Sequence, residues 1–422
     1  MKVSSAQAAS RLARLYCGYQ FFFSLLLWLP VFYEFQKRIG LGDAQIFSIQ
    51  SAYYLAFCLF EIPTGWFGDR FGYLKCLRSG AILLVVANLL PVFFASSAGM
   101  LTHFLAIALS RSLVSGAGSA HLYEGLSRLG EVSRYKQVEG NARAYGLLGK
   151  VVLWLFVGKL MEWRLDSPYL LTAALTSISV VYAYLLKPLE PLPKQLLISE
   201  AVLGNSFNHG APRSQSLLSV LHGLKQSPLL LALMFQGIGL FVLTRIVQVN
   251  LFQPILSSKR LDLALYGAVL STTSVFEAVG SARSGGLRKW IGDREAVFAL
   301  TATMAAVLFM LPWLGRGGTW LGLGVFSLAI GFATPIQRQL INDAIPDGKY
   351  RATFLSLESI LDRGACSWVA AYLSAALVHS GLDHFLWISA IFSLATVVSI
   401  QTWIAYLARA VPALDSKDRS RN

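Results

Sequence analysis

The sequence predicts an all-α polytopic membrane protein that crosses a lipid bilayer twelve times. Of its 422 residues, 55% are hydrophobic and only 14% are charged, and the mean hydropathy is +0.56. Soluble domains carry about 25% charged residues, so this chain is suited to lipid. Apolar stretches of about 20 residues, long enough to cross the hydrocarbon core, recur along its whole length. No segment is left over for a soluble domain.

Each predicted span is an apolar run bounded by charged or turn-forming residues. The four cysteines are scattered in or beside these runs without paired spacing, which favours small buried hydrophobes over a metal site or a disulfide. The twelve predicted helices lie at 14–36, 44–66, 77–96, 99–122, 140–162, 167–187, 228–251, 262–283, 294–314, 317–338, 351–379 and 383–409.

The net charge of +14 is explained by topology rather than by nucleic acid. With the N-terminus inside, 25 of the 36 Lys and Arg residues lie on the inner side and 7 on the outer side. Cytoplasmic loops of membrane proteins carry such a basic excess. We therefore expect both termini to be cytoplasmic and expect no nucleic-acid partner.

A long break rich in Pro, Ser, Asn and Gly separates the sixth and seventh spans. This 6 + 6 division, with short sequence echoes such as "EIPTGWFGDR" and "EAVGSARSGG", suggests two pseudo-symmetric six-helix bundles. The expected organisation is an N-terminal bundle over 1–187, a cytoplasmic linker over 188–227, a C-terminal bundle over 228–410 and a cytoplasmic tail over 411–422.

The turn between the second and third spans reads "EIPTGWFGDRFGYLK". With twelve spans and a long middle loop, it resembles the major facilitator superfamily, whose signature there is Gly-x-x-x-Asp-Arg-x-Gly followed by basic residues. Gly65, Asp69, Arg70 and Gly72 match, and Gly68 occupies a commonly small position. The "EIPTG" and "RATFLSLESILDRG" segments are similar to those of a bacterial branch of this family.

The resemblance implies that Asp69 faces the N-terminus of the eleventh helix, where free N–H groups favour an anion, and latches the two halves together. Glu124, at the inner end of the fourth helix, is placed to accept a basic partner such as Arg70 or Lys75. The family usually has a basic residue where this chain has Tyr73, so Lys75 or Arg78 would have to substitute.

Charged residues at membrane depth cost at least about 2.5–3.5 kcal/mol each and are candidate functional residues. Arg111 resembles the family's fourth-helix arginine, which implies proton coupling together with a carboxylate. The candidate carboxylates are Glu34, near the outer end of the first helix, Glu277, near the inner end of the eighth, and Glu358 and Asp362 in the eleventh. The candidate residues for a substrate cavity are Arg111, Lys150, Arg245 and Gln248.

The expected function is secondary active transport of a small organic solute across a bacterial inner membrane, coupled to protons. Cationic side chains at membrane depth favour an anionic substrate such as a metabolite or siderophore, and drug efflux is the alternative. A non-transporting membrane enzyme or receptor is a remote alternative, because no catalytic motif is present. We expect no cofactor and no metal, a lipid bilayer as surroundings, and a monomer.

Overall fold

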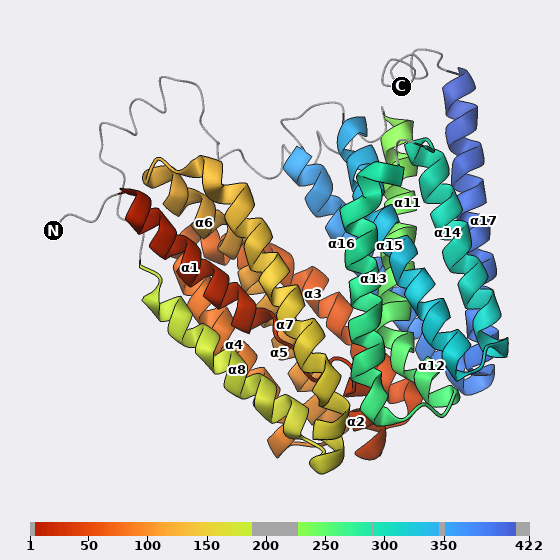
Figure 1. The fold of residues 1–422 in the computed structure, drawn as a ribbon, viewed down its shortest axis with the longest axis horizontal. Coiled ribbons are helices and arrows are strands. Elements are labelled where there is room, and N and C mark those ends of the chain that lie inside the picture. The colour runs from red at the N-terminus through yellow and green to blue at the C-terminus, as the bar shows by residue number, and fades with distance from the viewer. Residues whose placement is uncertain (1–4, 188–226, 288–289, 346–350, 411–422) are drawn as a thin grey trace. The chain divides into compact units, whose positions relative to one another are not determined.

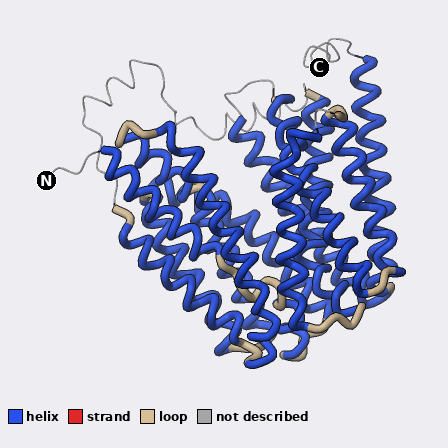
Figure 2. The backbone as a smooth tube through the Cα atoms, in the orientation of Figure 1, coloured by secondary structure: helices blue, strands red, loops and turns tan. Residues whose placement is uncertain are grey.

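The structure is a computed structural model that describes residues 5–187, 227–287, 290–345 and 351–410. Side chains are described in these ranges except at Asp69, 351–356 and 407–410. Every regular element in the described part of the chain is a helix (Figure 2). The predicted tail and nearly all of the predicted linker lie outside the described residues.

The chain divides into two compact units. The first comprises Met1–Gly210 with Leu263–Ala268, and the second comprises Ala211–Asp262 with Val269–Asn422.

In the first unit (Figure 1), α4 packs against α5 and α8, while α1 packs against α7 and α8. Its elements are α1 (Ser5–Ser24), α2 (Phe32–Arg38), α3 (Asp43–Phe71), α4 (Tyr73–Phe93), α5 (Ser97–Ser115), α6 (Ala117–Arg128), the short 3₁₀ helix η1 (Val132–Arg134), α7 (Tyr135–Trp163) and α8 (Ser167–Leu185).

In the second unit, α11 packs against α15, α16 and α17, and α14 packs against α15 and α17. The elements from residue 228 onward are α11 (Pro228–Arg245), the π-helix η2 (Ile246–Leu251), α12 (Phe252–Ser258), η3 (Leu263–Leu265), α13 (Tyr266–Leu287), α14 (Asp293–Met310), η4 (Leu311–Trp313), α15 (Arg316–Ala344), α16 (Arg351–His379) and α17 (Gly381–Ala410).

The all-α polytopic prediction is confirmed, and all twelve predicted spans fall on helix. Within the described residues, ten helical segments are long and apolar enough to cross a membrane. The other two predicted spans correspond to α1 with α2 and to α16. They are more polar, because α1 contains Arg11 and Arg14 and α16 contains Glu358, Asp362 and Arg363.

The first predicted span is not one continuous helix, because Pro30 interrupts it. Proline has no N–H and clashes with the carbonyl four residues earlier, which here belongs to Leu26. That carbonyl instead accepts a hydrogen bond from the Trp154 indole at 3.0 Å, and the Leu27 amide donates to Thr172 Oγ1 at 3.1 Å. Side chains of α7 and α8 thus replace the helical hydrogen bonds of the gap between α1 and α2.

The seventh span runs to Ser258, beyond the predicted end at 251, and has the same kind of interruption. Pro254 lies in α12, and the carbonyl four residues before it belongs to Asn250, in the π-helix η2. Single π-helical turns are a rare feature that is frequent at functional sites. Each of these two spans is therefore a long helix, an irregular or π-helical stretch, and a seven-residue helix.

An aromatic cluster forms the core of the first unit beside the interruption of its first span. Trp28 stacks on Tyr169 with ring centroids 5.7 Å apart and donates its indole N–H to Asn88 Oδ1 at 2.7 Å. His103 is fully buried against both rings, and its Nδ1 lies 2.6 Å from the Ala87 carbonyl oxygen. This packing fixes the segment that Pro30 frees from regular helix.

Candidate functional site

The turn between α3 and α4 is shorter than the sequence predicts. The helix α3 continues to Phe71, so Gly65 lies inside it and not at its end. Gly72 alone separates α3 from α4 and has φ +92°, a region that favours glycine. Gly68 lies against α4, since a Cβ there would be 3.4 Å from Cys76 Sγ. Gly72 thus forms a tight turn of a single residue.

The basic side chains of this turn contact aromatic rings and a helix end. The Arg70 guanidinium lies 5.2 Å from the centre of the Trp66 ring, and Lys75 Nζ lies 5.8 Å from that of Phe71. Arg78 donates to the Ala183 and Leu186 carbonyls at the end of α8, at 3.2 and 3.4 Å. Arg78 therefore stabilises a helix C-terminus, which leaves Lys75 as the candidate substitute for the basic residue that Tyr73 replaces.

Glu124 has a different partner from the one expected. It forms an ion pair with Arg128, one turn later in α6, and not with Arg70 or Lys75. Local pairing four residues apart on a helix is the simplest arrangement for such side chains. The side chain of Asp69 lies outside the described residues, so the latch attributed to it stays a prediction.

Arg111 lies in the middle of its membrane span. It is in α5, and the span Ser97–Arg128 is 32 residues long. One turn later, Gly116 separates α5 from α6. The Arg111 side chain is exposed, and within the described part of the first unit it makes no hydrogen bond or ion pair.

The other predicted cations and Glu34 occupy less distinctive surroundings. Lys150 is half-buried in α7. Arg245 is exposed at the end of α11, 5.3 Å from the centre of the Phe241 ring. Glu34 forms an ion pair with Arg38 at 3.0 Å, and both side chains are partly exposed. Exposed pairs of this kind contribute little to stability.

In the second unit, a predicted substrate-cavity residue contacts a predicted proton-coupling carboxylate. The Gln248 amide, in the π-helix η2, donates to Glu277 Oε2 of α13 at 2.9 Å and to Ser327 Oγ of α15 at 3.4 Å. The three side chains place a carboxylate, an amide and a hydroxyl together. Such a set can exchange hydrogen bonds with a polar ligand.

Glu277 lies at a different position along its helix from the one that the sequence predicts. The helix α13 spans Tyr266–Leu287, so Glu277 lies at its middle and not near its inner end. Close packing of α13 on α15 holds it there: a Cβ at Gly331 would overlap the Glu277 carbonyl oxygen, and Ser281 donates to the Gly331 carbonyl at 3.1 Å.

Glu358 and Asp362 are the most deeply buried of the predicted carboxylates. Their residues are 5% and 7% exposed, and they lie four positions apart on α16, which places them on one helix face. Arg338 of α15 approaches Glu358 Oε2 at 3.8 Å, beyond hydrogen-bonding distance. Among the described residues, no group donates a hydrogen bond to Glu358 Oε2 or Asp362 Oδ1.

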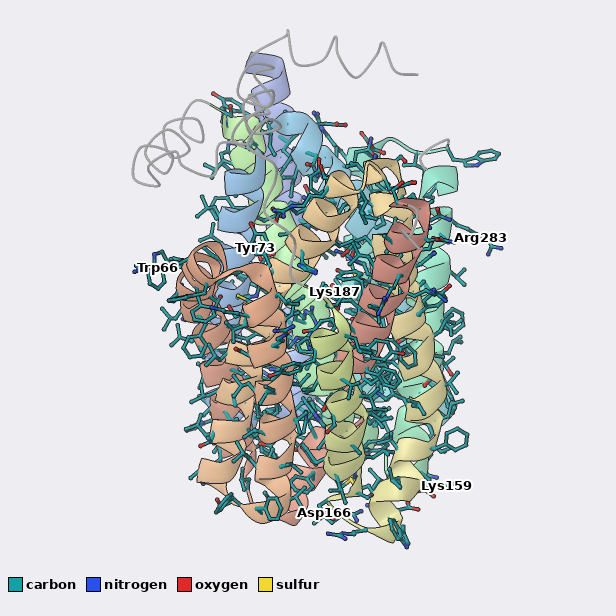
Figure 3. All side chains as sticks on the ribbon, turned by 90° about the vertical axis from the view of Figure 1, so that its left-hand side faces the viewer. Trp66, Tyr73, Lys159, Asp166, Lys187 and Arg283 are labelled. Carbon is teal, nitrogen blue, oxygen red and sulfur yellow. The ribbon has the colours of Figure 1, made fainter. Side chains whose placement is uncertain are left out.

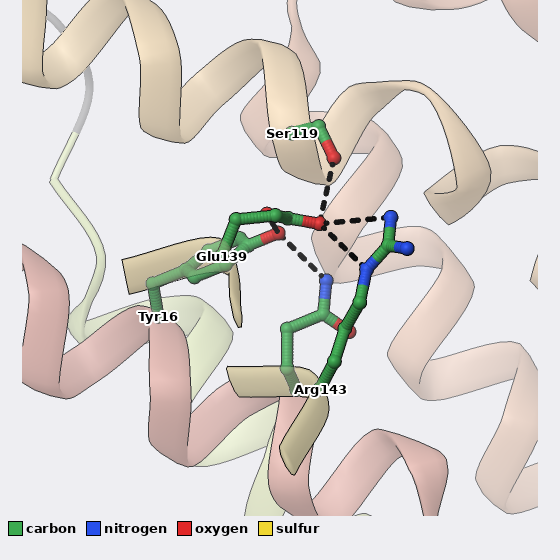
Figure 4. A network of polar contacts seen from close by, with 5 residues as sticks. Tyr16, Ser119, Glu139 and Arg143 are labelled. Carbon is green, nitrogen blue, oxygen red and sulfur yellow. Dashed lines mark hydrogen bonds and ion pairs between the residues drawn. The ribbon is translucent and has the colours of Figure 1, made fainter. Parts of the chain in front are cut away.

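One polar centre was missed by the sequence reasoning. The carboxylate of Glu139 in α7 accepts from Tyr16 of α1 at 2.7 Å, from Ser119 of α6 at 3.2 Å and from Arg143 at 3.4 Å (Figure 4). Gln20 in turn donates to the Tyr16 hydroxyl at 3.0 Å. This network joins three helices of the first unit. An acid followed by "GNARAYG" at the start of a span was its only sequence signal.

An apolar hollow of about 330 Å³ lies in the first unit, and none of the predicted site residues lines it. Its walls come from the end of α7, from α8 and from Leu27. Figure 3 shows Lys159, on its rim, and Asp166 toward the end of the unit where α7 meets α8, away from Trp66 and Tyr73. Its lining is apolar apart from Lys159, so it offers a polar substrate a single charged group.

A model of the major facilitator superfamily matches residues 13–361. The chain belongs to this superfamily. Most of its length is matched, and the matched region includes Arg111, Gln248, Glu277 and Glu358. It is thus a multi-pass membrane protein of a transporter superfamily.

Solved transporters share the fold of this superfamily member. The nucleoside transporter NupG is 12% identical with a TM-score of 0.72, covering 94% of this chain and 98% of its own. A POT family transporter in complex with a thioalcohol-conjugated peptide is 14% identical, with a TM-score of 0.69 and coverage of 94% and 96%. A D-xylose-proton symporter is 12% identical, with a TM-score of 0.67 and coverage of 94% and 96%. No curated protein matches the chain.

Proposed function

We propose that this protein is a secondary active transporter that moves a small organic solute by alternating access. The observation that carries the proposal is the family match over residues 13–361, together with polar and charged side chains at the middle of apolar spans. Such groups are costly in a membrane and mark substrate or ion pathways. In this proposal the two units act as the two bundles that rock.

Proton coupling is the energy source that the charged residues favour. Glu277, Glu358 and Asp362 supply carboxylates within the membrane-spanning helices of the second unit, and Arg111 supplies an exposed cation in the first. A conformational change that alters the surroundings of a carboxylate can load or release a proton. Glu34 already has Arg38 as its partner, so we assign it no coupling role.

The substrate class follows from Arg111. A guanidinium presents a planar set of donors that fits a carboxylate or phosphate, and that of Arg111 is exposed. We therefore propose an anionic metabolite or a siderophore as substrate. Lys150 and Arg245 are weaker candidates for the same role, and Gln248 with Glu277 is a candidate for polar contacts in the second unit.

We propose that the turn from α3 to α4 is part of a gate. We also propose that the protein lies in a bacterial inner membrane with both termini in the cytoplasm. Asp69 would engage the N-terminus of α16, as the family signature implies, and Gly72 would set the angle between α3 and α4. We propose that the protein works as a monomer.

Counterflow in proteoliposomes tests this function. Proteoliposomes that contain the purified protein are loaded in turn with anionic metabolites, siderophores and amphipathic drugs. Accumulation of the same labelled solute is then measured with and without a pH gradient. We expect accumulation of an anionic solute, and expect Arg111→Ala to abolish proton-driven flux while Lys159→Ala, at an exposed position of α7, does not.

Three results would contradict parts of the proposal. Accumulation of drugs alone would favour efflux over anion transport. Unchanged flux in Arg111→Ala would remove Arg111 from the mechanism. No accumulation of any solute under either condition would refute transport.

A further inference from the structure

Three buried polar side chains of the second unit lie on two helices that both pack on α11. Gln337 of α15, and Glu358 and Asp362 of α16, are 3%, 5% and 7% exposed. A Cβ at Gly237 would lie 3.0 Å from Glu358 Oε1 and 3.4 Å from Gln337 Nε2. The carboxylate and the amide thus meet over the bare backbone of Gly237.

The orientation of the Gln337 amide is fixed by a hydrogen bond. Its nitrogen, Nε2, donates to the Leu233 carbonyl at 2.7 Å. This bond assigns the amide oxygen, Oε1, to the opposite side of the amide group. That oxygen has no donor among the described residues, and neither has Glu358 Oε2 or Asp362 Oδ1. Buried polar atoms are almost always paired, so three buried oxygens without a donor on neighbouring helices point to a ligand.

Nearby arginines do not satisfy these oxygens. Arg338, Arg363 and Arg245 act electrostatically on Asp362. The Arg338 side chain, however, is 64% exposed and remains 3.8 Å from Glu358. Arg363 donates to Ser359, and Arg245 lies over the Phe241 ring. The guanidinium groups balance the negative charge of the two carboxylates, which weakens the case for a divalent ion, but they leave the oxygen atoms unpaired.

We propose that Glu358, Asp362 and Gln337 form a binding site for Na⁺. Oxygen ligands suit hard cations. Among the described residues, no third acidic, histidine or cysteine side chain joins the two carboxylates, so a monovalent ion matches the site better than Ca²⁺ or Mg²⁺. Protons bind the same carboxylates, and Na⁺ therefore competes with them. The role of Na⁺ as a second coupling ion rests on the proposed transport function, whereas the binding itself does not.

Thermal unfolding of the purified full-length protein tests the binding. NaCl is titrated against choline chloride at constant ionic strength, with KCl as a second reference. We expect a saturable rise of Tm with Na⁺, since a ligand that binds only the folded state stabilises it, and little response to K⁺. Competition predicts that the apparent affinity for Na⁺ falls by up to about tenfold for each unit that the pH is lowered.

Matched variants separate the site from general salt effects. Glu358→Gln and Asp362→Asn are each expected to lose the Na⁺ response, and Asp383→Asn, an exposed acid of α17 in the same unit, is expected to keep it. Binding of radioactive ²²Na⁺ to the wild-type protein, displaced by unlabelled Na⁺ and not by K⁺, provides the test if a variant fails to fold.

Absence of Na⁺-specific binding in the wild type would overturn the proposal, and so would an undiminished response in both variants. Na⁺ binding without counterflow of any solute would support the site while refuting the transport function. Counterflow without Na⁺ binding would do the reverse, so the two failures can be told apart.

Discussion

The hydrogen bond between Tyr16 and Glu139 is expected to stabilise the first unit measurably. Tyr16 is fully buried, and its hydroxyl donates to the carboxylate across 2.7 Å. Hydrogen bonds to charged groups contribute about 1.5–3 kcal/mol. Glu139→Ala should therefore lower the free energy of unfolding by about that amount. Glu139→Gln, which keeps an acceptor oxygen without the charge, should lower it by roughly half as much.

A double-mutant cycle isolates this contact. Tyr16→Phe and Glu139→Ala are made singly and together, and the free energy of unfolding is measured by denaturant titration in mixed micelles. We expect a coupling energy of about 1–3 kcal/mol, within the range for residues in direct contact. Arg143→Ala is the control: its side chain is 77% exposed and its bond to Glu139 is 3.4 Å long, so the change should be within about 0.5 kcal/mol.

A coupling energy indistinguishable from zero would refute the reasoning, because the two side chains would then contribute independently. A loss from Arg143→Ala as large as that from Glu139→Ala would also contradict it. The exposed ion pair, and not the buried hydroxyl, would then be the main partner of Glu139.

Two glycines give further predictions. Gly72→Ala forces a side chain into a conformation with φ +92° and should cost about 1–3 kcal/mol; in the same thermal-unfolding assay, helical Gly68→Ala should be neutral or mildly stabilising. Gly331→Ala places a methyl group against the Glu277 carbonyl and should cost about 1–3 kcal/mol through overpacking. Gly364→Ala, where a Cβ meets open space, serves as its control, and equal Tm values for the two would contradict the close contact of α13 with α15.

Hydropathy predicted where helices lie far better than how they are interrupted. All twelve predicted spans fall on helix, because lipid requires long apolar segments with internally satisfied backbones. Proline at position 30 was visible in the sequence. Its effect was not predicted, since the groups that satisfy the freed backbone, Trp154 and Thr172, lie more than 100 residues away.

The candidate site shows the same limit. Because Glu358 and Asp362 are four residues apart, they share one face of α16, and their burial together could be expected from the sequence. The meeting of Gln248 with Glu277 could not, because it depends on the register between two helices. Glu139 was missed because its acceptor role is created by Tyr16, 123 positions earlier. A local pattern carries no information about such a partner.

The polarity of α16 has a consequence for the insertion of the protein into the membrane. Each charge near the centre of a helix opposes insertion by about 2.5–3.5 kcal/mol, and α16 carries Glu358, Asp362 and Arg363 close together. This helix is therefore expected to insert inefficiently into the membrane on its own. Its natural partner, α11, is synthesised more than 100 residues earlier. The second unit must accordingly keep α11 and α15 available until α16 emerges, because Glu358 of α16 lies against Gly237 of α11 beside Gln337 of α15.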